Sequence, residues 1–162
     1  KPLGITGALA LGGALLFAQV KGNTGKVSKE EQHNIGLATE ELKDMLQYGH
    51  LELADKTMDP GYIQHNPNVP QGRDGFKQFM SRVPGRTPQE IKPEWKSAPV
   101  LTIANGPYVF MMWDRKAKDP ADPSKEYTWN HFDVVRVEKG LIKEHWDEAR
   151  IAPPQQIGRA HV

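Results

Sequence analysis

The stretch His131-Phe-Asp-Val-Val-Arg-Val-Glu-Lys-Gly-Leu-Ile-Lys-Glu-His-Trp-Asp147 decides the fold that we expect for this chain. Two runs of β-branched, aromatic and charged residues flank Glu138-Lys139-Gly140. This pattern is typical of two antiparallel strands joined by a tight turn that has glycine at its third position. We therefore predict a β-hairpin with a three-residue loop, in which Gly140 forms a bulge in the left-handed conformation.

The register of this hairpin decides which side chains share a face. With the three-residue loop, Asp133 lies opposite His145 and His131 lies opposite Asp147, all on one side of the sheet. The same register places Val135, Val137 and Leu141 on that side, and Phe132, Val134, Arg136, Ile142, Glu144 and Trp146 on the other. A two-residue loop would instead split the four polar side chains between the faces. Two imidazoles and two carboxylates together look like a site, and the alternative is a solvated face with two surface ion pairs.

Composition limits the class of protein. The chain has 162 residues, of which 38% are hydrophobic and 25% charged, which suits one globular domain with a real core. The formal net charge is +1 and there is no basic run, so we expect no nucleic-acid partner. The absence of cysteine excludes disulfides, thiolate metal sites and a cysteine nucleophile.

The N-terminal residues differ from the rest of the chain. Residues 3–20 carry no charge, Lys1 precedes them, and Ala18-Gln19-Val20 ends the run. This pattern is typical of an export signal. A helix of this length spans roughly 27 Å at about 1.5 Å per residue, which is marginal for a membrane anchor. We therefore expect an exported protein, periplasmic or extracellular, with an anchor and then a buried core helix as the less favoured interpretations.

These features divide the chain into three parts. Residues 1–27 are the apolar signal or anchor with a polar linker, and any membrane contact would involve residues 3–20 alone. Residues 28–152 are the folded domain. Residues 153–162 lack any periodicity and are expected to form a frayed tail.

The first part of the domain predicts helices. Ser28-Lys29-Glu30-Glu31 is a capping box, and the apolar spacing after it predicts a helix that ends near Gly49. A shorter helix is expected at 51–58, followed by a break at 59–61. Residues 72–83 predict a third helix with Phe76, Phe79, Met80 and Val83 on its inward side.

The second part of the domain predicts strands. We expect a weak strand at 91–97, better strands at 100–104 and 108–115, a charged loop at 116–125, and two last strands at 127–137 and 141–150. Helices followed by antiparallel strands indicate an α+β fold, with helices on one face of a curved sheet. Such a sheet closed by helices forms a cone that can hold a ligand in its mouth.

The order of elements and three motifs resemble a known family. The motifs are Tyr-x-x-His-Asn-Pro at 62–67, Gly-x-x-Gly-Phe at 72–76, and Asp-x-x-Arg-x-x-x-Gly-x-Ile-x-Glu-His-Trp-Asp at 133–147. Over residues 29–150 the chain resembles the SnoaL-like polyketide cyclases of the NTF2-like superfamily, which have a cystatin-like α+β cone. The resemblance implies a homodimer and a reaction without metal or cofactor.

The resemblance also implies roles for individual residues. In the cyclases an aspartate on the final strand is the acid/base of an intramolecular aldol condensation, and its position matches Asp147. A histidine of those enzymes is replaced here by Asp133, and His131 could substitute for it. The asparagine before proline matches Asn66, and His65 is an addition in this chain.

Aldol chemistry needs a base for a carbon-bound proton and a donor for the enolate oxygen. In ketosteroid isomerase, an aspartate in an apolar site acts as the base for this kind of chemistry. We hypothesise that Asp147 is the base and that Asp133 orients an imidazole. The donors or proton shuttles would be His145, His131 and His65. The substrate, a small apolar carbonyl compound, would be bound by Tyr62, Asn66, Phe79, Trp113 and Trp129, although the aromatic residues could equally be ordinary core.

Three other hypotheses about function are compatible with the sequence. The domain could bind a small molecule without catalysis. The same base could perform dehydration, isomerisation or epoxide opening. Nitrogen and oxygen atoms of the five His and Asp residues could also bind zinc, manganese or iron, although no spacing demands it.

Overall fold

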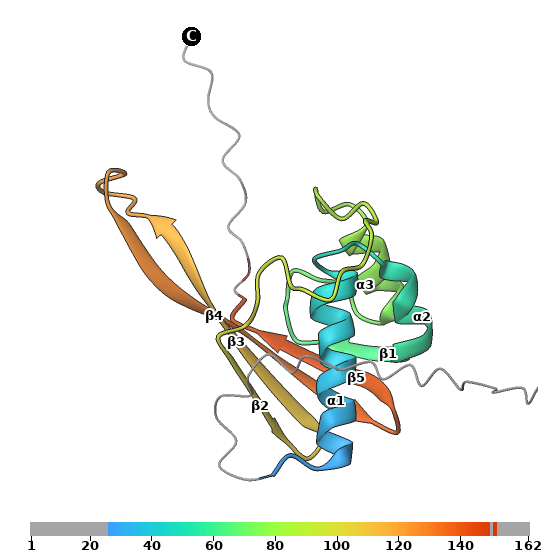
Figure 1. The fold of residues 1–162 in the computed structure, drawn as a ribbon. Coiled ribbons are helices and arrows are strands. Elements are labelled where there is room, and N and C mark those ends of the chain that lie inside the picture. The colour runs from blue at the N-terminus through green and yellow to red at the C-terminus, as the bar shows by residue number, and fades with distance from the viewer. Residues whose placement is uncertain (1–25, 150, 152–162) are drawn as a thin grey trace, which may run out of the picture.

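The computed structural model describes residues 26–149 and 151, in which helices lie on one face of a five-stranded sheet (Figure 1). This arrangement confirms the predicted α+β architecture. The predictions for the export signal or anchor and for the C-terminal tail concern residues that lie outside the described part of the chain. Within that part, no helix has both the length and the apolar character needed to cross a membrane.

The first helix begins where the capping box predicts. Helix α1, Lys29–Thr39, is preceded by Ser28, whose Oγ accepts from the backbone N–H of Glu31 at 3.1 Å, while the Glu31 side chain accepts from the Ser28 N–H at 2.8 Å. The helix continues as the π-helical segment η1, Glu40–Met45. It ends near Gly49, which has a φ of +85°.

A short helical segment and an edge strand follow. The segments η2, Leu51–Leu53, and α2, Ala54–Thr57, confirm the second predicted helix. The predicted break at 59–61 is wrong, because strand β1, Met58–Gln64, runs through it. An edge strand tolerates a proline, and a register irregularity between Met58 and Ile63 accommodates it.

The third helix is shorter than the apolar pattern predicted. Helix α3, Arg73–Met80, ends three residues before Val83. Phe76 is fully buried, and Phe79 and Met80 are partly buried against the same core. Single-turn hydrogen bonds from Arg82 to Phe79 and from Val83 to Met80 then lead the chain out of the helix.

The remaining strands complete the sheet. They are β2, Leu101–Asn105; β3, Tyr108–Lys118; β4, Glu126–Glu138; and β5, Leu141–Asp147. The order across the sheet is β1-β5-β4-β3-β2, and only β1 and β5 are parallel. The predicted strand at 91–97 is wrong, because these residues are irregular. The predicted loop at 116–125 is shorter, because β3 and β4 extend as a long arm of the sheet (Figure 1).

The β4–β5 hairpin has a different turn and register from those predicted. Its loop has two residues, Lys139 and Gly140, both with positive φ, which is the φ pattern of a type I′ turn. Such a loop alone would have split the polar residues between faces. However, β5 contains one extra residue, Lys143, between the pairs Arg136–Glu144 and Val137–Ile142. This bulge shifts the outer part of β5 by one residue and restores the shared face.

The core lies between the helices and the inner face of the sheet. Inward side chains from β3 and β4, including Val109, Met111 and Val135, pack against the buried stripe of α1 and η1. Ile142 was predicted on the outer face, but it is fully buried and lies opposite Val137. This placement is a consequence of the two-residue turn.

Candidate active site

Four polar side chains of the β4–β5 hairpin lie on the inner face, as predicted, but with other neighbours. Asp133 is directly opposite Asp147, and Val135 is opposite His145. The predicted pairings of Asp133 with His145 and of His131 with Asp147 are therefore wrong. The middle of β4 and the last residues of β5 nevertheless bring two imidazoles and two carboxylates together beside the core.

His145 is held at both ring nitrogens. Its Nδ1 donates to Oε1 of Glu41 at 2.8 Å, and its Nε2 donates to Oδ1 of Asp133 at 3.0 Å. All three side chains are buried, with residue exposures of 3% for His145, 0% for Glu41 and 6% for Asp133. The imidazole thus links strand β4 to the π-helical segment η1 across the core.

His131 occupies the other oxygen of Asp133. Its Nε2 lies 3.2 Å from Oδ2 of Asp133, and its Nδ1 lies 2.5 Å from Oε1 of Glu148, just beyond β5. The His131 side chain is 26% exposed, so this end of the chain of contacts reaches solvent. Carboxylates and imidazoles therefore alternate from Glu148 at the surface to Glu41 in the interior.

The pKa values follow from these contacts. Hydrogen bonding to Asp133 raises the pKa of His131 to about 9, although partial burial opposes this shift. Burial acts to raise the pKa of Asp133, but hydrogen bonds from His131 and His145 outweigh it and lower the pKa to about 2. Burial acts to lower the pKa of His145, but Glu41 and Asp133 outweigh it and raise the pKa to about 10. Near neutral pH, two imidazolium rings thus enclose an ionised Asp133.

Asp147 has much weaker support than Asp133. Its Oδ2 accepts one hydrogen bond, from Nδ2 of Asn66 at 2.9 Å. Its Oδ1 is buried and has no hydrogen-bond partner. One oxygen of this carboxylate thus has no hydrogen-bond partner, whereas both oxygens of Asp133 are paired with imidazoles.

Tyr62 and Gln64 extend the buried polar cluster along β1. The Tyr62 hydroxyl donates to Oε1 of Glu41 at 3.4 Å and accepts from Nε2 of Gln64 at 3.1 Å. Burial and the charge of Glu41 raise the pKa of Tyr62 well above its usual range. This hydroxyl therefore stays protonated and serves as a donor to Glu41.

The other predicted site residues are more dispersed. His65 lies on the opposite face, where it stacks on Trp146 with ring centroids 4.3 Å apart and lies 2.8 Å from Oε2 of Glu144. Trp113 is buried, and Trp129 is exposed at 40%; both rings lie near the ring of His131, at centroid distances of 5.7 and 6.3 Å. Phe79 is part of the core periphery.

Sequence reasoning missed Glu41 and Glu148. Glu41 had a detectable signal, because it is four residues from both Leu37 and Met45 on the inward stripe of the first helix. A charged residue on such a stripe is rarely fully buried without a partner. Glu148 carries no comparable signal, since it follows the last strand and is exposed.

The cluster also has a geometry that a divalent cation could use. Asp133, His145 and Asp147 offer ligand atoms that lie within 4.8 Å of one another. However, a cation at Nε2 of His145 would have to replace the proton that this ring shares with Asp133. The raised pKa of His145 favours the ion-paired state over metal binding.

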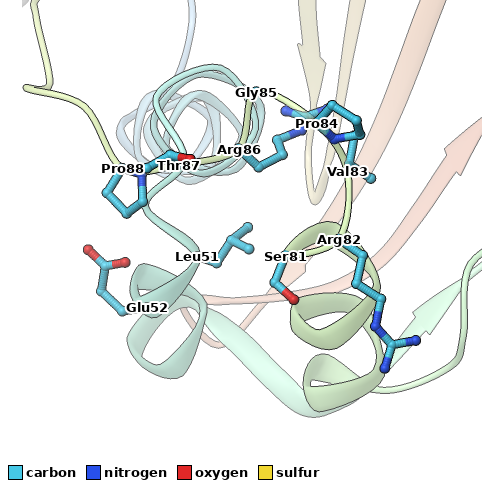
Figure 2. Close-up of a pocket in the computed structure, with 11 residues that line it drawn as sticks. Leu51, Glu52, Ser81, Arg82, Val83, Pro84, Gly85, Arg86, Thr87 and Pro88 are labelled. Atoms are coloured by element: carbon cyan, nitrogen blue, oxygen red, sulfur yellow. The ribbon is translucent and has the colours of Figure 1, made fainter.

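A separate open hollow lies beside the segment η2 and the chain that follows helix α3. It has a volume of about 540 Å³, and Figure 2 shows Leu51 in the middle of its labelled residues, with the guanidinium of Arg82 extending away from it. The lining residues are Gly49, Leu51, Glu52, Ser81, Arg82, Val83, Pro84, Gly85, Arg86, Thr87 and Pro88. None of them belongs to the inner-face polar cluster, and we place the candidate site at the cluster because the buried carboxylates and imidazoles meet there.

Comparisons with solved structures give the same fold. An NTF2-like protein of unknown function from Burkholderia pseudomallei shares 17% identity, with a TM-score of 0.51 over 73% of this chain and 91% of that chain. A candidate SnoaL-like polyketide cyclase from Jannaschia shares 17% identity, with a TM-score of 0.50 over 76% and 91%. An epoxide hydrolase of the LEH-like type from M. tuberculosis shares 18% identity, with a TM-score of 0.50 over 73% and 83%.

At these identities the likeness concerns the fold. No curated protein matches the chain. The family described as the SnoaL-like domain matches residues 39–145, which is more than half of the chain and includes Glu41, Asp133 and His145. The chain therefore belongs to the SnoaL-like domain family.

Proposed function

We propose that this protein is a cofactor-independent acid/base enzyme, in which Asp147 removes a proton from a carbon atom next to a carbonyl group. The proposed substrate is a small apolar carbonyl compound, and the proposed reaction is an aldol-type condensation or cyclisation. The observation that carries the proposal is the free, buried Oδ1 of Asp147. A base in this position is shielded from water, and one of its oxygens accepts no hydrogen bond until the surrounding side chains open to admit a substrate.

The two neighbouring aspartates are suited to different tasks. Asp133 is held by two imidazoles, and its lowered pKa makes it a poor proton acceptor. Asp147 receives a single amide hydrogen bond. Different environments for two adjacent carboxyl groups are a common way to separate a base from an orienting group. We therefore assign the base role to Asp147 and the orienting role to Asp133.

The proposed reaction has three steps. Oδ1 of Asp147 takes the proton, and the electron pair of the C–H bond moves toward the carbonyl, whose oxygen becomes an enolate. The enolate carbon then attacks a second carbonyl group of the same molecule, which forms a C–C bond and an alkoxide. Asp147 returns the proton to the alkoxide, so the enzyme ends in its starting state.

His131 is the proposed donor to the enolate oxygen, for which its Nδ1–H would have to exchange the exposed partner Glu148 for the substrate. Its ring is partly exposed and is protonated near neutral pH. The rings of Trp113 and Trp129 lie beside it and would provide the apolar contact surface for the substrate. His145, with both nitrogens occupied, would orient Asp133, and His65 would take no part because it lies on the other face.

Proton exchange at carbon tests the base directly. The full chain is incubated with a panel of β-keto esters in D₂O, and exchange of the α-proton is followed by NMR. We expect Asp147→Asn to lower the enzyme-dependent rate by roughly 10²- to 10⁴-fold. Asp114→Asn is the matched control, because Asp114 also accepts one asparagine amide hydrogen bond, from Asn130 at 2.8 Å, but lies exposed on β3.

The same assay separates the proposal from its alternatives. An Asp147→Asn variant that folds and exchanges protons at the wild-type rate would refute the base role. Ligand-induced thermal stabilisation without any exchange would indicate a binding domain. Loss of exchange after EDTA treatment, with recovery on addition of Zn²⁺ or Mn²⁺, would favour the metal interpretation of Asp133, His145 and Asp147.

A further inference from the structure

Glu41 occupies an unusual position for a charged residue. Its side chain has an exposure of 0% and lies in the π-helical segment η1, at a point where the N–H of Leu46 bonds to the Glu41 carbonyl, five residues back. Oε1 is the acceptor for both His145 and Tyr62, whereas Oε2 is buried and has no hydrogen-bond partner. π-Helical turns are often found at functional sites.

Packing does not explain a glutamate at this position. Its neighbours on the same buried stripe, Leu37 and Met45, are apolar. A buried carboxylate with one unpaired oxygen lowers stability, and apolar side chains in place of the whole ion pair are often neutral or better. Since packing does not explain Glu41, we look to its contact with His145, which can orient the imidazole ring.

The geometry shows what Glu41 does to His145. Because Glu41 holds Nδ1, the ring is oriented with Nε2 toward Oδ1 of Asp133. His131 holds the second oxygen of Asp133 from the other side. We propose that Glu41 is a positioning residue of the site, which fixes His145 against Asp133 and so leaves Asp147 as the carboxylate with an unpaired oxygen.

This inference rests on the proposed base role of Asp147, but its physical part can be measured without any substrate. The charged and titratable groups that face His145 are Glu41 from η1, Tyr62 from β1, Asp133 from β4 and Asp147 from β5. The charge of Glu41 is the largest of the effects that raise the pKa of His145 against burial. Removal of that charge should therefore change the titration of His145 more than that of any other histidine.

Glu41→Gln tests the proposal, with Glu40→Gln as the matched control. Glu40 is the preceding residue of the same π-helical segment and is only half-buried. The pH titration of His145 is followed in the full chain by side-chain ¹⁵N NMR. We expect the midpoint to fall by more than one pH unit in Glu41→Gln and to stay at the wild-type value in Glu40→Gln. An unchanged midpoint in Glu41→Gln would overturn the proposal.

Proton exchange of a β-keto ester supplies the functional readout. We expect at least a tenfold loss of kcat in Glu41→Gln with little change in KM, and a new decline of kcat as the pH rises through the lowered His145 midpoint. A merely structural role would lower the unfolding temperature without moving this pH profile. If Glu41→Gln does not fold, Glu41→Asp replaces it, because the shorter side chain keeps the charge but draws the carboxylate back from Nδ1 of His145, which should lower the same midpoint.

The outcomes distinguish the two proposals. If Asp147→Asn is fully active, the proposed base role fails, whatever the titration of His145 shows. If Asp147→Asn is inactive but Glu41→Gln exchanges protons like the wild type, the base role stands and the positioning role of Glu41 is refuted. If both variants lose activity and only Glu41→Gln shifts the His145 midpoint, both proposals are supported.

Discussion

Asp133 and Asp147 face each other across strands β4 and β5, yet they have opposite surroundings. Each oxygen of Asp133 meets an imidazole, at 3.0 Å from His145 and 3.2 Å from His131. Asp147 meets only the amide of Asn66, and its second oxygen has no partner. Two aspartates in directly opposed positions thus differ in how many of their oxygens have a hydrogen-bond partner.

Asn66 supports Asp147 through its Nδ2, while its Oδ1 accepts from the backbone N–H and the side-chain amide of Asn68. Asn66→Ala removes the donor at 2.9 Å from Oδ2 and leaves a half-buried carboxylate without its hydrogen bond. We expect kcat for α-proton exchange to fall roughly ten- to a hundredfold, since a hydrogen bond to a charged group is worth about 1.5–3 kcal/mol. Asn130→Ala, which removes the equivalent bond to exposed Asp114, is the control and should retain wild-type exchange.

The stability of the domain should have a maximum in mildly acidic solution. The pKa of Asp133 falls from 3.8 to about 2, so its stabilising effect is present above pH 4 and is lost as the pH falls toward 2. The pKa of His131 rises from 6.5 to about 9, so its effect is present below pH 6.5 and is lost as the pH rises toward 9. Urea unfolding at a series of pH values should therefore show the highest free energy of unfolding between about pH 4 and 6.5.

Removal of the Asp133 carboxylate should make the free energy of unfolding less dependent on pH, both in acid and in alkaline solution. Asp133→Asn abolishes the group that titrates near pH 2 and also the main cause of the raised pKa of His131. We expect the histidine titration midpoint of His131 to move back toward 6.5, as measured by NMR. A pH–stability curve of Asp133→Asn with the same two limbs as the wild type would contradict this account.

Two glycines should respond in opposite directions to alanine. Gly49 has a φ of +85°, and a β-carbon there would lie 2.6 Å from the Arg86 carbonyl oxygen, so Gly49→Ala should destabilise the fold by at least about 1–2 kcal/mol. Gly36 lies exposed in α1 with nothing within 4 Å of a β-carbon, so Gly36→Ala should stabilise it by roughly 0.5–1 kcal/mol. Thermal unfolding of both variants shows whether each substitution raises or lowers the unfolding temperature. A Gly49→Ala variant as stable as the wild type would contradict the proposed strain.

The outer face of the sheet is the proposed homodimer interface. Phe132, exposed at 37%, stacks on Phe110, and Tyr108 lies against Trp146, which makes an apolar aromatic surface on a face opposite to the helix-covered core. Contiguous surfaces of this kind mark association sites in soluble proteins. We expect the wild type to be a dimer in light scattering and Phe132→Lys to be a folded monomer.

The tip of the sheet provides the control for this prediction. Tyr127 is exposed at 47% on the arm formed by β3 and β4, away from the aromatic surface. Tyr127→Lys should therefore remain dimeric. A monomeric wild type would refute the proposed dimer, and a dimer that survives Phe132→Lys would place its interface elsewhere.

Local patterns predicted the elements that depend on local physics. The capping box at Ser28 defined the start of α1, because the two hydrogen bonds join residues only three apart. Alternation of apolar and polar residues defined β3, β4 and β5, because side chains alternate across any strand. The strand through Pro60 was missed, because pairing along an edge strand overrides the local tendency of Asp-Pro-Gly to form a turn.

The sequence by itself determined that His131 shares a face with Asp133 and that His145 shares a face with Asp147, because even spacing along a strand is enough for that. That the two pairs lie on the same face depended on the bulge. Only the tertiary structure decided how they are connected. The turn and the bulge at Lys143 set the register, and Glu41 reaches His145 across 104 residues of chain. Such contacts depend on how helix and sheet pack together, which no local pattern encodes, and they make Asp133 and Asp147 chemically different.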